Sequence, residues 1–372
     1  MGSLMHPHRR IFLALLIMLL APQPGLADDV SATFFTRTDS DGTRVISPGA
    51  EVRVDFGNGE TQLEAGYSMD IWTSASIDVR TAATRPVTEQ RDELRGALRH
   101  EADNTTILGA YRYSTETDYI SHGGSITVLQ SLANGSADVG GSIFAAADEV
   151  GRSGDNAFSR DLATLGVSMT YNQILDRRTL MQMTYEFARR EGYQASPYRF
   201  VAIGGDGLCS GDAITCVPES HPDVRLRHAT VLRLRRAMGD DHSLGASFRF
   251  YIDNWGILST TASTQWAWVV GRDSTLRTKY RYYRQQGADF YRSSYEASSA
   301  GLPALRSRDR ELSPMDHHRV ALSLEHAFEI TDSGPTTRIT IGLGGAMLNY
   351  MNFVGLDRIY AADLVLSASV DL

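Results

Sequence analysis

Apolar and polar residues alternate along most of the chain, in segments that turn residues separate. The last segment shows the alternation most clearly, because every second residue from Tyr360 to the terminal Leu372 is apolar. A period of two places one apolar face and one polar face on a β-strand. Such a strand at the C-terminus either closes a β-barrel by pairing with the first strand or forms the edge of a soluble β-sandwich.

The same alternation recurs from residue 30 onwards and predicts about sixteen strands, within a range of about fourteen to eighteen. Turns such as Gly57-Asn58-Gly59 and Asn134-Gly135 separate neighbouring segments. No helical periodicity of comparable length competes with them. The predicted strands cover residues 30–37, 44–56, 62–71, 91–102, 105–116, 124–132, 137–147, 164–171, 181–187, 224–238, 242–253, 258–270, 276–286, 320–330, 339–347 and 360–372.

Short and long connections alternate between these segments. Turns such as Asp176-Arg177 are short, whereas the connections at residues 73–90, 191–223 and 291–314 are long. Membrane-spanning barrels show this parity because short turns face the periplasm and long loops face the outside. A soluble sandwich has no reason to keep it over so many hairpins. The sequence therefore predicts an all-β fold, a transmembrane antiparallel up-and-down β-barrel with short periplasmic turns and long extracellular loops.

Residues 1–27 have the pattern of a secretory signal peptide. Two arginines precede the apolar run Ile11–Leu20, and small residues follow it, which predicts cleavage after Ala27. An uncleaved membrane anchor is the alternative. No later apolar run approaches the roughly 18 residues of a transmembrane helix. We therefore predict export to the bacterial outer membrane, with residues 28–372 as a single barrel domain.

The charge balance and the aromatic residues agree with this prediction. The chain has 36 basic and 44 acidic residues, a formal net charge of −8 at pH 7, which argues against a general nucleic-acid-binding protein. Aromatic residues spaced by two lie on one face of a strand. In a barrel they fit the girdles at the membrane interfaces, and in a soluble protein they would be core. These pairs are Trp266 and Trp268, Tyr280 and Tyr282, and Tyr111 and Tyr113.

A barrel of about sixteen strands encloses an aqueous lumen unless loops fill it. The alternation places many charged residues on the polar faces of their strands, and we predict that they line the lumen, with a basic wall over segments 224–238, 242–253 and 276–286. Opposed charges either orient solutes in an open pore or pair with each other and rigidify a filled one. The predicted lumen residues are Arg225, Arg227, Arg233, Arg235, Arg249, Arg277, Lys279, Arg281, Glu64, Asp70, Glu186, Glu325 and Asp363.

The two cysteines, Cys209 and Cys216, both lie in the long connection 191–223. In an oxidising compartment we expect them to form a disulfide, with a redox-active pair as the alternative. No serine-centred elbow, zinc-binding helix, phosphate loop or dinucleotide fingerprint occurs. We therefore predict no catalytic, metal or cofactor site. A barrel hydrolase remains an alternative, since its residues can come from different strands.

Six short motifs occur in order along the mature chain: Ile46-Ser47-Pro48, Ser74–Val79, Ser114–Ser121, Ser196–Arg199, Tyr251–Ile257 and Gln285–Tyr291. With these motifs the chain resembles a bacterial family catalogued as a domain of unknown function, number three-five-seven-zero. The resemblance implies an outer-membrane barrel of Gram-negative bacteria with no established activity. Members of the family are often encoded beside thioredoxin-like and flavin-attaching proteins, which implies an extracytoplasmic redox system.

These motifs cluster where the predicted strands enter the long loops. We expect the following residues to pack as a rim or plug network, or alternatively to form a ligand site at the barrel mouth: Asp118, Tyr119, Tyr198, Arg199, Asp253 and Trp255.

The predicted function is a porin-like pore, or the membrane-spanning component of a transport or extracytoplasmic redox assembly. A barrel enzyme, a structural anchor with a filled lumen and a soluble periplasmic ligand-binding protein are the alternatives. The expected partners are outer-membrane lipid, the barrel-assembly machinery and a periplasmic redox or transport partner, with no nucleic acid.

Overall fold

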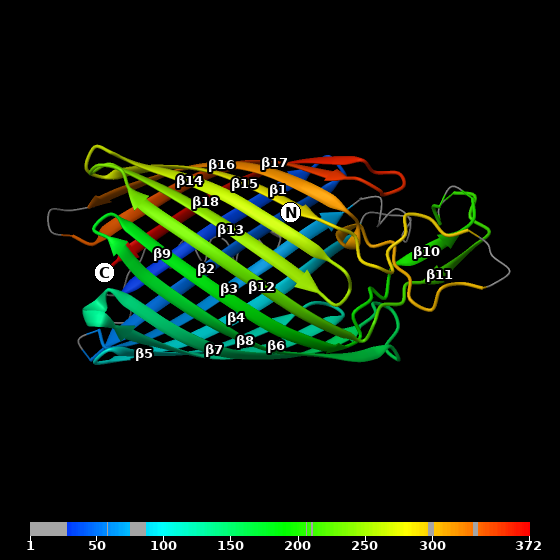
Figure 1. Ribbon diagram of the computed structural model, residues 1–372, viewed down its shortest axis with the longest axis horizontal. Helices are drawn as coiled ribbons and strands as arrows, with labels where there is room; N and C mark the ends of the chain where they lie inside the picture. Colours follow the sequence, from blue (N-terminus) through cyan, green and yellow to red (C-terminus); the bar gives the residue numbers. More distant parts are fainter. Residues whose placement is uncertain are drawn as a thin grey trace, which may run out of the picture.

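The computed structural model describes residues 28–57, 59–74, 87–205, 207–209, 211–296, 301–329 and 334–372. Sixteen antiparallel strands close into one barrel, which confirms the predicted fold class (Figure 1). They are β1 (Asp29–Asp39), β2 (Thr43–Phe56), β3 (Thr61–Ser74), β4 (Val87–Ala102), β5 (Thr105–Thr115), β6 (Tyr119–Leu132), β7 (Ala137–Gly151), β8 (Ser159–Asp176), β9 (Thr179–Gly192), β12 (Val224–Ala237), β13 (His242–Asp253), β14 (Leu258–Val270), β15 (Ser274–Gln285), β16 (Met315–Glu329), β17 (Thr336–Tyr350) and β18 (Arg358–Asp371).

The C-terminal strand closes the sheet. β18 pairs antiparallel with β17 on one side and with β1 on the other, with Val370 opposite Val30 and Leu366 opposite Phe34. The pairing continues to the chain end, where the Leu372 amide donates to the Asp28 carbonyl over 2.9 Å. Because every strand has two neighbours, the described barrel has no open edge, as a sheet in lipid requires.

Short turns and long loops separate to opposite ends of the barrel. The turns between β4 and β5 and between β8 and β9 contain two residues each, and Asp103 in the first adopts a φ of 51°. The long connection between β9 and β12 contains a separate two-stranded hairpin of β10 (Phe200–Ile203) and β11 (Thr215–Pro218). The hairpin projects beyond the barrel in Figure 1, at the end opposite the C-terminus. The sequence pattern had predicted only a loop here.

Two predictions fall on parts of the chain outside the described residues. These are the signal peptide 1–27 and most of the connection 73–90, of which residues 75–86 are not described. The helices of the described chain are two short 3-10 turns, η1 (Ala133–Gly135) and η2 (Arg310–Leu312). Within the described residues, no helix has the length and apolar character needed to cross a membrane.

The outer face of the barrel is a belt of apolar side chains. Ile126, Ile143 and Met169 each expose more than 60% of their surface, although large apolar patches are rare on proteins that water surrounds. Aliphatic residues on all sides of the barrel face outwards at the same alternate positions, as expected for strands that contact lipid.

Aromatic residues recur on this outer face in one particular arrangement. In three strand pairs, a tyrosine hydroxyl lies 2.7–2.8 Å from the Nδ1 atom of a histidine on the neighbouring strand. A second aromatic ring, two residues after the tyrosine, lies directly opposite the histidine, with ring centroids 4.8–5.0 Å apart. The hydrogen-bonded pairs are Tyr111 and His122, Tyr185 and His228, and Tyr280 and His318.

Candidate functional site

Six of the eight basic residues predicted for the lumen line cavities inside the barrel, and Arg277 and Arg281 border none of them. Alternation along β12 places Arg225, Arg227, Arg233 and Arg235 on the same face, and all four border internal cavities. Lys279 of β15 borders the same cavity as Arg233 and Arg235, and Arg249 of β13 borders the cavity that Arg225 lines. One side of the lumen, from β12 to β15, is therefore rich in cations.

Three of the five predicted acidic residues pair with arginines on the adjacent strand or on the next strand but one. Asp363 of β18 accepts from Arg319 over 2.7 Å, and Glu325 of β16 accepts from Arg277 at 3.2 and 3.3 Å. Asp70 forms an ion pair with Arg91. Similar pairs link Arg95 with Glu51 and Arg112 with Glu93, at 3.7 and 3.5 Å. These pairs neutralise much of the wall opposite the basic side.

The other two predicted acidic residues, Glu64 and Glu186, form no ion pair with an arginine among the described residues. Glu64 of β3 borders a cavity of about 740 Å³ between β3 and β9. Glu186 of β9 lies opposite Ala229 on β12 and opposite Ser168 on β8. Among the described residues, no basic side-chain nitrogen lies within 4 Å of the carboxylate of Glu64 or of Glu186.

The basic wall contains cations without acidic partners. Within the described chain, no carboxylate oxygen lies within 4 Å of seven side chains of β9, β12, β13 and β15, whereas Arg225 and Arg277 on the same wall are paired. Arg233 donates instead to the neutral side-chain amide of Gln182. The unpaired cations are Arg190, Arg227, Arg233, Arg235, Arg249, Lys279 and Arg281.

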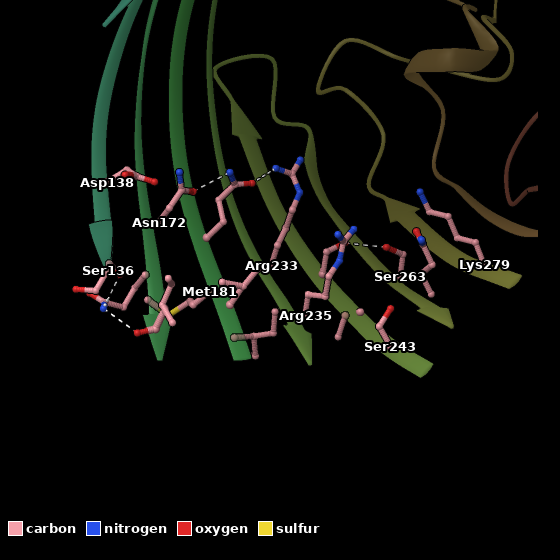
Figure 2. A pocket seen from close by; sticks show the side chains of 18 of the residues that line it. Ser136, Asp138, Asn172, Met181, Arg233, Arg235, Ser243, Ser263 and Lys279 are labelled. Atoms are coloured by element: carbon pink, nitrogen blue, oxygen red, sulfur yellow. Dashed lines mark hydrogen bonds between the residues drawn. The ribbon is translucent and has the colours of Figure 1, made fainter. Parts of the chain in front are cut away.

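Three of these cations line the half of the lumen that lies nearer the short turns. Arg233, Arg235 and Lys279 border a cavity of about 660 Å³ together with one acid, Asp138, and neutral polar residues such as Asn172 and Gln182. Figure 2 shows the two arginines between Asn172 on one side and Lys279 on the other. The surroundings of this cavity combine positive charge with hydrogen-bonding groups, which suits a polar and anionic solute.

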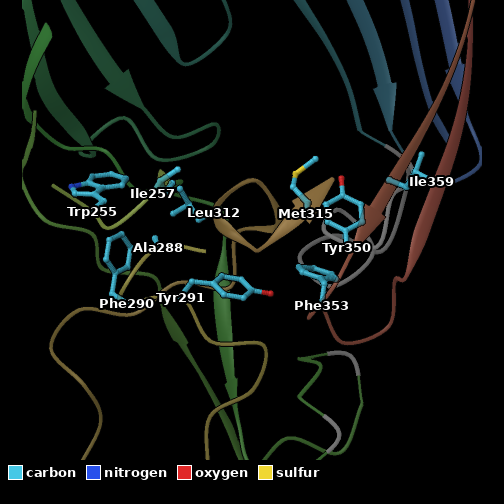
Figure 3. Close-up of a cluster of buried hydrophobic side chains, with 10 residues drawn as sticks. All are labelled: Trp255, Ile257, Ala288, Phe290, Tyr291, Leu312, Met315, Tyr350, Phe353 and Ile359. Carbon is cyan, nitrogen blue, oxygen red and sulfur yellow. The ribbon is translucent and has the colours of Figure 1, made fainter. Parts of the chain in front are cut away.

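The opposite end of the barrel carries a structured cap. We use "cap" for the described residues of the loops 193–223, 254–257, 286–314 and 351–357. Their apolar side chains form the main buried cluster of the described chain, which Figure 3 shows with Trp255 and Phe290 on one side, Tyr350 and Phe353 on the other, and Tyr291 between them. Barrel strands contribute to the cluster through Met315 of β16, Tyr350 of β17 and Ile359 of β18. The loops therefore have a hydrophobic core of their own.

Polar contacts fasten the cap to several strand ends. Arg310 donates to Asp41 in the turn between β1 and β2 over 2.7 Å. The side-chain amide of Gln285, at the end of β15, donates to the Ser313 carbonyl over 2.6 Å. Within the cap, Arg308 donates to the Val354 carbonyl over 2.6 Å and joins two of its loops. The cap is thus held on more than one side of the barrel.

The predicted rim residues form three separate contacts. Tyr198 donates to Asp118, and Arg199 forms an ion pair with Asp309. Asp253 and Trp255 belong to a third group, at the start of the β13–β14 turn. Tyr119 borders the lumen cavity of about 740 Å³ and contacts none of the other five through a hydrogen bond found in the described chain. Adjacency of Tyr198 and Arg199 along the chain links the first two contacts.

Asp253 is the central acceptor of the third group. Its Oδ2 atom accepts from Arg225 Nε and Nη2 at 2.8 and 2.6 Å and from the Tyr251 hydroxyl at 2.8 Å. Its Oδ1 atom accepts from the backbone amides of Trp255 and Ile257, each at 3.0 Å. The Arg225 guanidinium also lies over the Trp255 ring, 4.3 Å from its centroid. These bonds use the accepting capacity of the carboxylate.

A cavity of about 400 Å³ lies between the cap and the barrel wall, and we call it the vestibule. Four arginines border it, together with Tyr251, Tyr283 and cap residues that include His221 and Leu312. Two of the arginines, Arg190 and Arg227, also border the 740 Å³ lumen cavity. They therefore stand where the vestibule meets the lumen. The four are Arg190, Arg225, Arg227 and Arg249.

Arg190 was not among the predicted lumen residues. The predicted strand ended at residue 187, but β9 continues to Gly192. Extending the polar phase of Gln182, Thr184 and Glu186 by two more steps reaches Arg190, so alternation contained the signal.

Inside the cap, a buried carboxylate holds two loops together. Glu219 Oε1 accepts from the Arg308 amide at 2.7 Å and from the Ser307 hydroxyl at 3.1 Å. Its Oε2 atom lies 3.5 Å from Nε2 of His221. Burial alone raises the pKa of a carboxyl, but the contact with His221 and the charge of Arg199 outweigh it and hold the pKa of Glu219 below its usual 4.5.

Cys209 and Cys216 form a disulfide in the β10–β11 hairpin region, with their Cα atoms 5.9 Å apart. The described residues contain no cluster of three or more histidine, cysteine, aspartate or glutamate side chains arranged to hold a metal ion.

The barrel resembles solved outer-membrane proteins. A bacterial polysaccharide outer membrane secretin aligns with a TM-score of 0.51 and 7% identity, over 92% of this chain and 98% of that one. CdiB from Acinetobacter baumannii aligns with a TM-score of 0.49 and 8% identity, over 91% and 60%. The siderophore receptor PirA from Pseudomonas aeruginosa aligns with a TM-score of 0.45 and 11% identity, over 93% and 62%. At such identities the likeness to the secretin shows the fold alone.

The sequence itself matches one family model. No curated protein matches the chain, but the model described as "Protein of unknown function (DUF3570)" matches residues 143–337, more than half of its length. The matched range contains the basic wall, the vestibule arginines and three of the six sequence motifs, which confirms the resemblance found in the sequence. The chain belongs to this family.

Proposed function

We propose that the protein is an outer-membrane channel for small solutes, with a lumen that favours anions. The observation that carries the proposal is the set of cations without acidic partners along β9, β12, β13 and β15. Residues that serve only to rigidify a lumen are expected in ion pairs, as on the opposite wall. Unpaired cations facing water raise the local concentration of anions instead.

The order of the cavities supports a path. Arg190 and Arg227 connect the vestibule under the cap to the lumen, and Arg233, Arg235 and Lys279 continue the positive charge towards the short turns. The apolar belt supports a position in a membrane. An assignment to an extracytoplasmic redox assembly stays a prediction from the family resemblance.

The test is conductance of the purified full-length protein in planar bilayers, with a salt gradient of KCl across the membrane. We expect channels with a reversal potential of the sign that chloride selectivity produces. The combined substitutions Arg233→Gln, Arg235→Gln and Lys279→Gln should move that potential towards zero, because they remove three unpaired charges. Raising the salt concentration should weaken the selectivity of the unmodified protein by screening.

Arg236→Gln is the matched control, because Arg236 lies on the opposite face of the same strand and pairs with Asp176 at 3.4 Å. This variant should conduct like the unmodified protein. A barrel that is correctly folded by heat-modifiable migration but silent in bilayers contradicts the channel and favours the filled-lumen anchor or enzyme. Conductance that does not discriminate between the ions contradicts the anion preference.

A further inference from the structure

We infer that the vestibule is a binding site for a small solute that carries two or more carboxylate or phosphate groups. The inference rests on the proposed function, since it names the class of solute that the channel holds before passage. Its physical basis is a group of four arginines, three of which have no ion pair within 4 Å among the described residues.

Three neighbouring strands bring these charges together. Arg190 of β9 lies directly opposite Arg225 of β12, and Arg227 is diagonal to Arg190 across the same pair of strands. Arg249 follows on β13, opposite Val231. Like charges directly opposite each other in a sheet are destabilising, so the arrangement needs a counter-charge.

Among the described residues, the one carboxylate that bonds to this group is already saturated. Asp253 lies opposite Arg227 in the register of β12 and β13, but its five hydrogen bonds come from Arg225, Tyr251 and two backbone amides. Asp253 therefore neutralises Arg225 alone. Among the described residues, Arg190, Arg227 and Arg249 have no acidic partner within 4 Å, and the Nε atom of Arg190 is buried without a hydrogen-bond partner.

The chemistry of the free groups specifies the ligand. A guanidinium presents parallel N–H donors that match the two oxygens of a carboxylate or phosphate. Three such groups exceed the charge of a monoanion, so they favour a solute with at least two negative groups. The volume of about 400 Å³ is near the lower end of small-molecule sites, which restricts the solute to a compact molecule. The rings of Tyr251 and Tyr283 also line the wall, and on the cap side Asp309, which pairs with Arg199, and Glu311 border the cavity.

The experiment is isothermal titration calorimetry of the full-length protein in detergent at low salt, with citrate and pyrophosphate as probes and acetate as the monovalent comparison. We expect saturable binding of at least one polyvalent probe and much weaker binding of acetate. The double variant Arg190→Gln, Arg227→Gln should bind at least about tenfold more weakly, because it removes charge-assisted hydrogen bonds. Arg236→Gln, on the outer face, should bind like the unmodified protein.

Arg249→Gln provides a second variant in case the double variant fails to fold, and it should also weaken binding. No saturable heat with either polyvalent probe overturns the site, and so does equal affinity in the vestibule variants and Arg236→Gln. Calorimetry needs no ion current, so the two proposals fail separately. Binding without conductance supports the binding site and contradicts the channel. Anion-selective conductance without binding supports the channel and contradicts the binding site.

Discussion

At the scale of single residues, two buried carboxylates organise the region around the cap. Asp253 joins β12 to the β13–β14 turn, and Glu219 joins the loop after β11 to the loop before η2. Asp253 is saturated with donors, whereas Glu219 accepts two hydrogen bonds on Oε1 and has only the ion contact with His221 on Oε2. Such partners are the condition under which a buried charge stabilises a structure. Each carboxylate therefore holds together segments that lie far apart in the sequence.

Glu219 predicts how the cap responds to acid. Because its pKa in the folded cap lies below the usual 4.5, the ionised form stabilises the cap above that value, and this contribution is lost as the pH falls through the lowered pKa. We expect the cap to loosen in this acidic range. Fluorescence of Trp255, which packs 5.4 Å from the His221 ring, should report it in a protein whose other three tryptophans are phenylalanine.

The variant Glu219→Gln should lose this transition, because it has no proton to gain. Glu219→Ala should loosen the cap already at neutral pH, since it leaves the Arg308 amide and Ser307 hydroxyl without an acceptor, at a cost of about 1–3 kcal/mol. An unchanged acid transition in Glu219→Gln would show that another group is responsible.

At the scale of the elements, alternation was sufficient to predict the sixteen barrel strands, although several of them, such as β8 and β9, extend beyond the predicted ends. It succeeded because each membrane strand has one face in lipid and one in water, a contrast that every second residue reports. It did not predict the β10–β11 hairpin, whose strands have four residues each. Nor did it predict the cap contacts, because pairs such as Arg199 and Asp309 depend on loops that have no periodicity.

The tyrosine–histidine pairs of the outer face give a prediction at this scale. Tyr280→Phe removes the hydroxyl that lies 2.8 Å from His318 Nδ1, and we expect it to lower the free energy of unfolding by about 0.5–1.5 kcal/mol. Tyr282→Phe is the control on the same strand and face, because Tyr282 contacts His318 through its ring, with centroids 4.8 Å apart.

Urea unfolding in lipid vesicles, followed by electrophoretic heat-modifiability, measures both variants. Tyr282→Phe should stay within about 0.5 kcal/mol of the unmodified protein. Equal losses in the two variants would mean that the hydrogen bond contributes nothing specific.

At the scale of the whole molecule, the structure combines a rigid wall with a separately packed cap. The wall is continuous and fully paired, whereas the cap depends on a small cluster and on a few charged contacts. Elements with fewer buried contacts open at lower free energy than the body of a protein. We therefore expect the cap to be the first part that proteases reach.

Arg199→Ala tests this expectation. The substitution removes the partner of Asp309, whose carboxylate accepts from the Glu311 amide at the start of η2, and it should destabilise the cap by about 1.5–3 kcal/mol. Trypsin should then cleave the purified protein faster at Arg292 and Arg306 in the loop 286–314. Arg189→Ala removes an exposed pair with Glu191 and should leave cleavage there unchanged. If both variants are cleaved alike, the Arg199 contact does not hold the cap.

The bond between Arg310 and Asp41 has a consequence for the order of assembly. Its partners are 269 residues apart, and only the pairing of β1 with β18 brings the first turn beside the strands that flank Arg310. The disulfide, in contrast, joins cysteines that are 7 residues apart and depends on no distant strand. Before β1 pairs with β18, the disulfide of the hairpin can therefore form, but the bond between Arg310 and Asp41 cannot. Attachment of the cap through this bond is the last step of assembly and indicates that the barrel has closed.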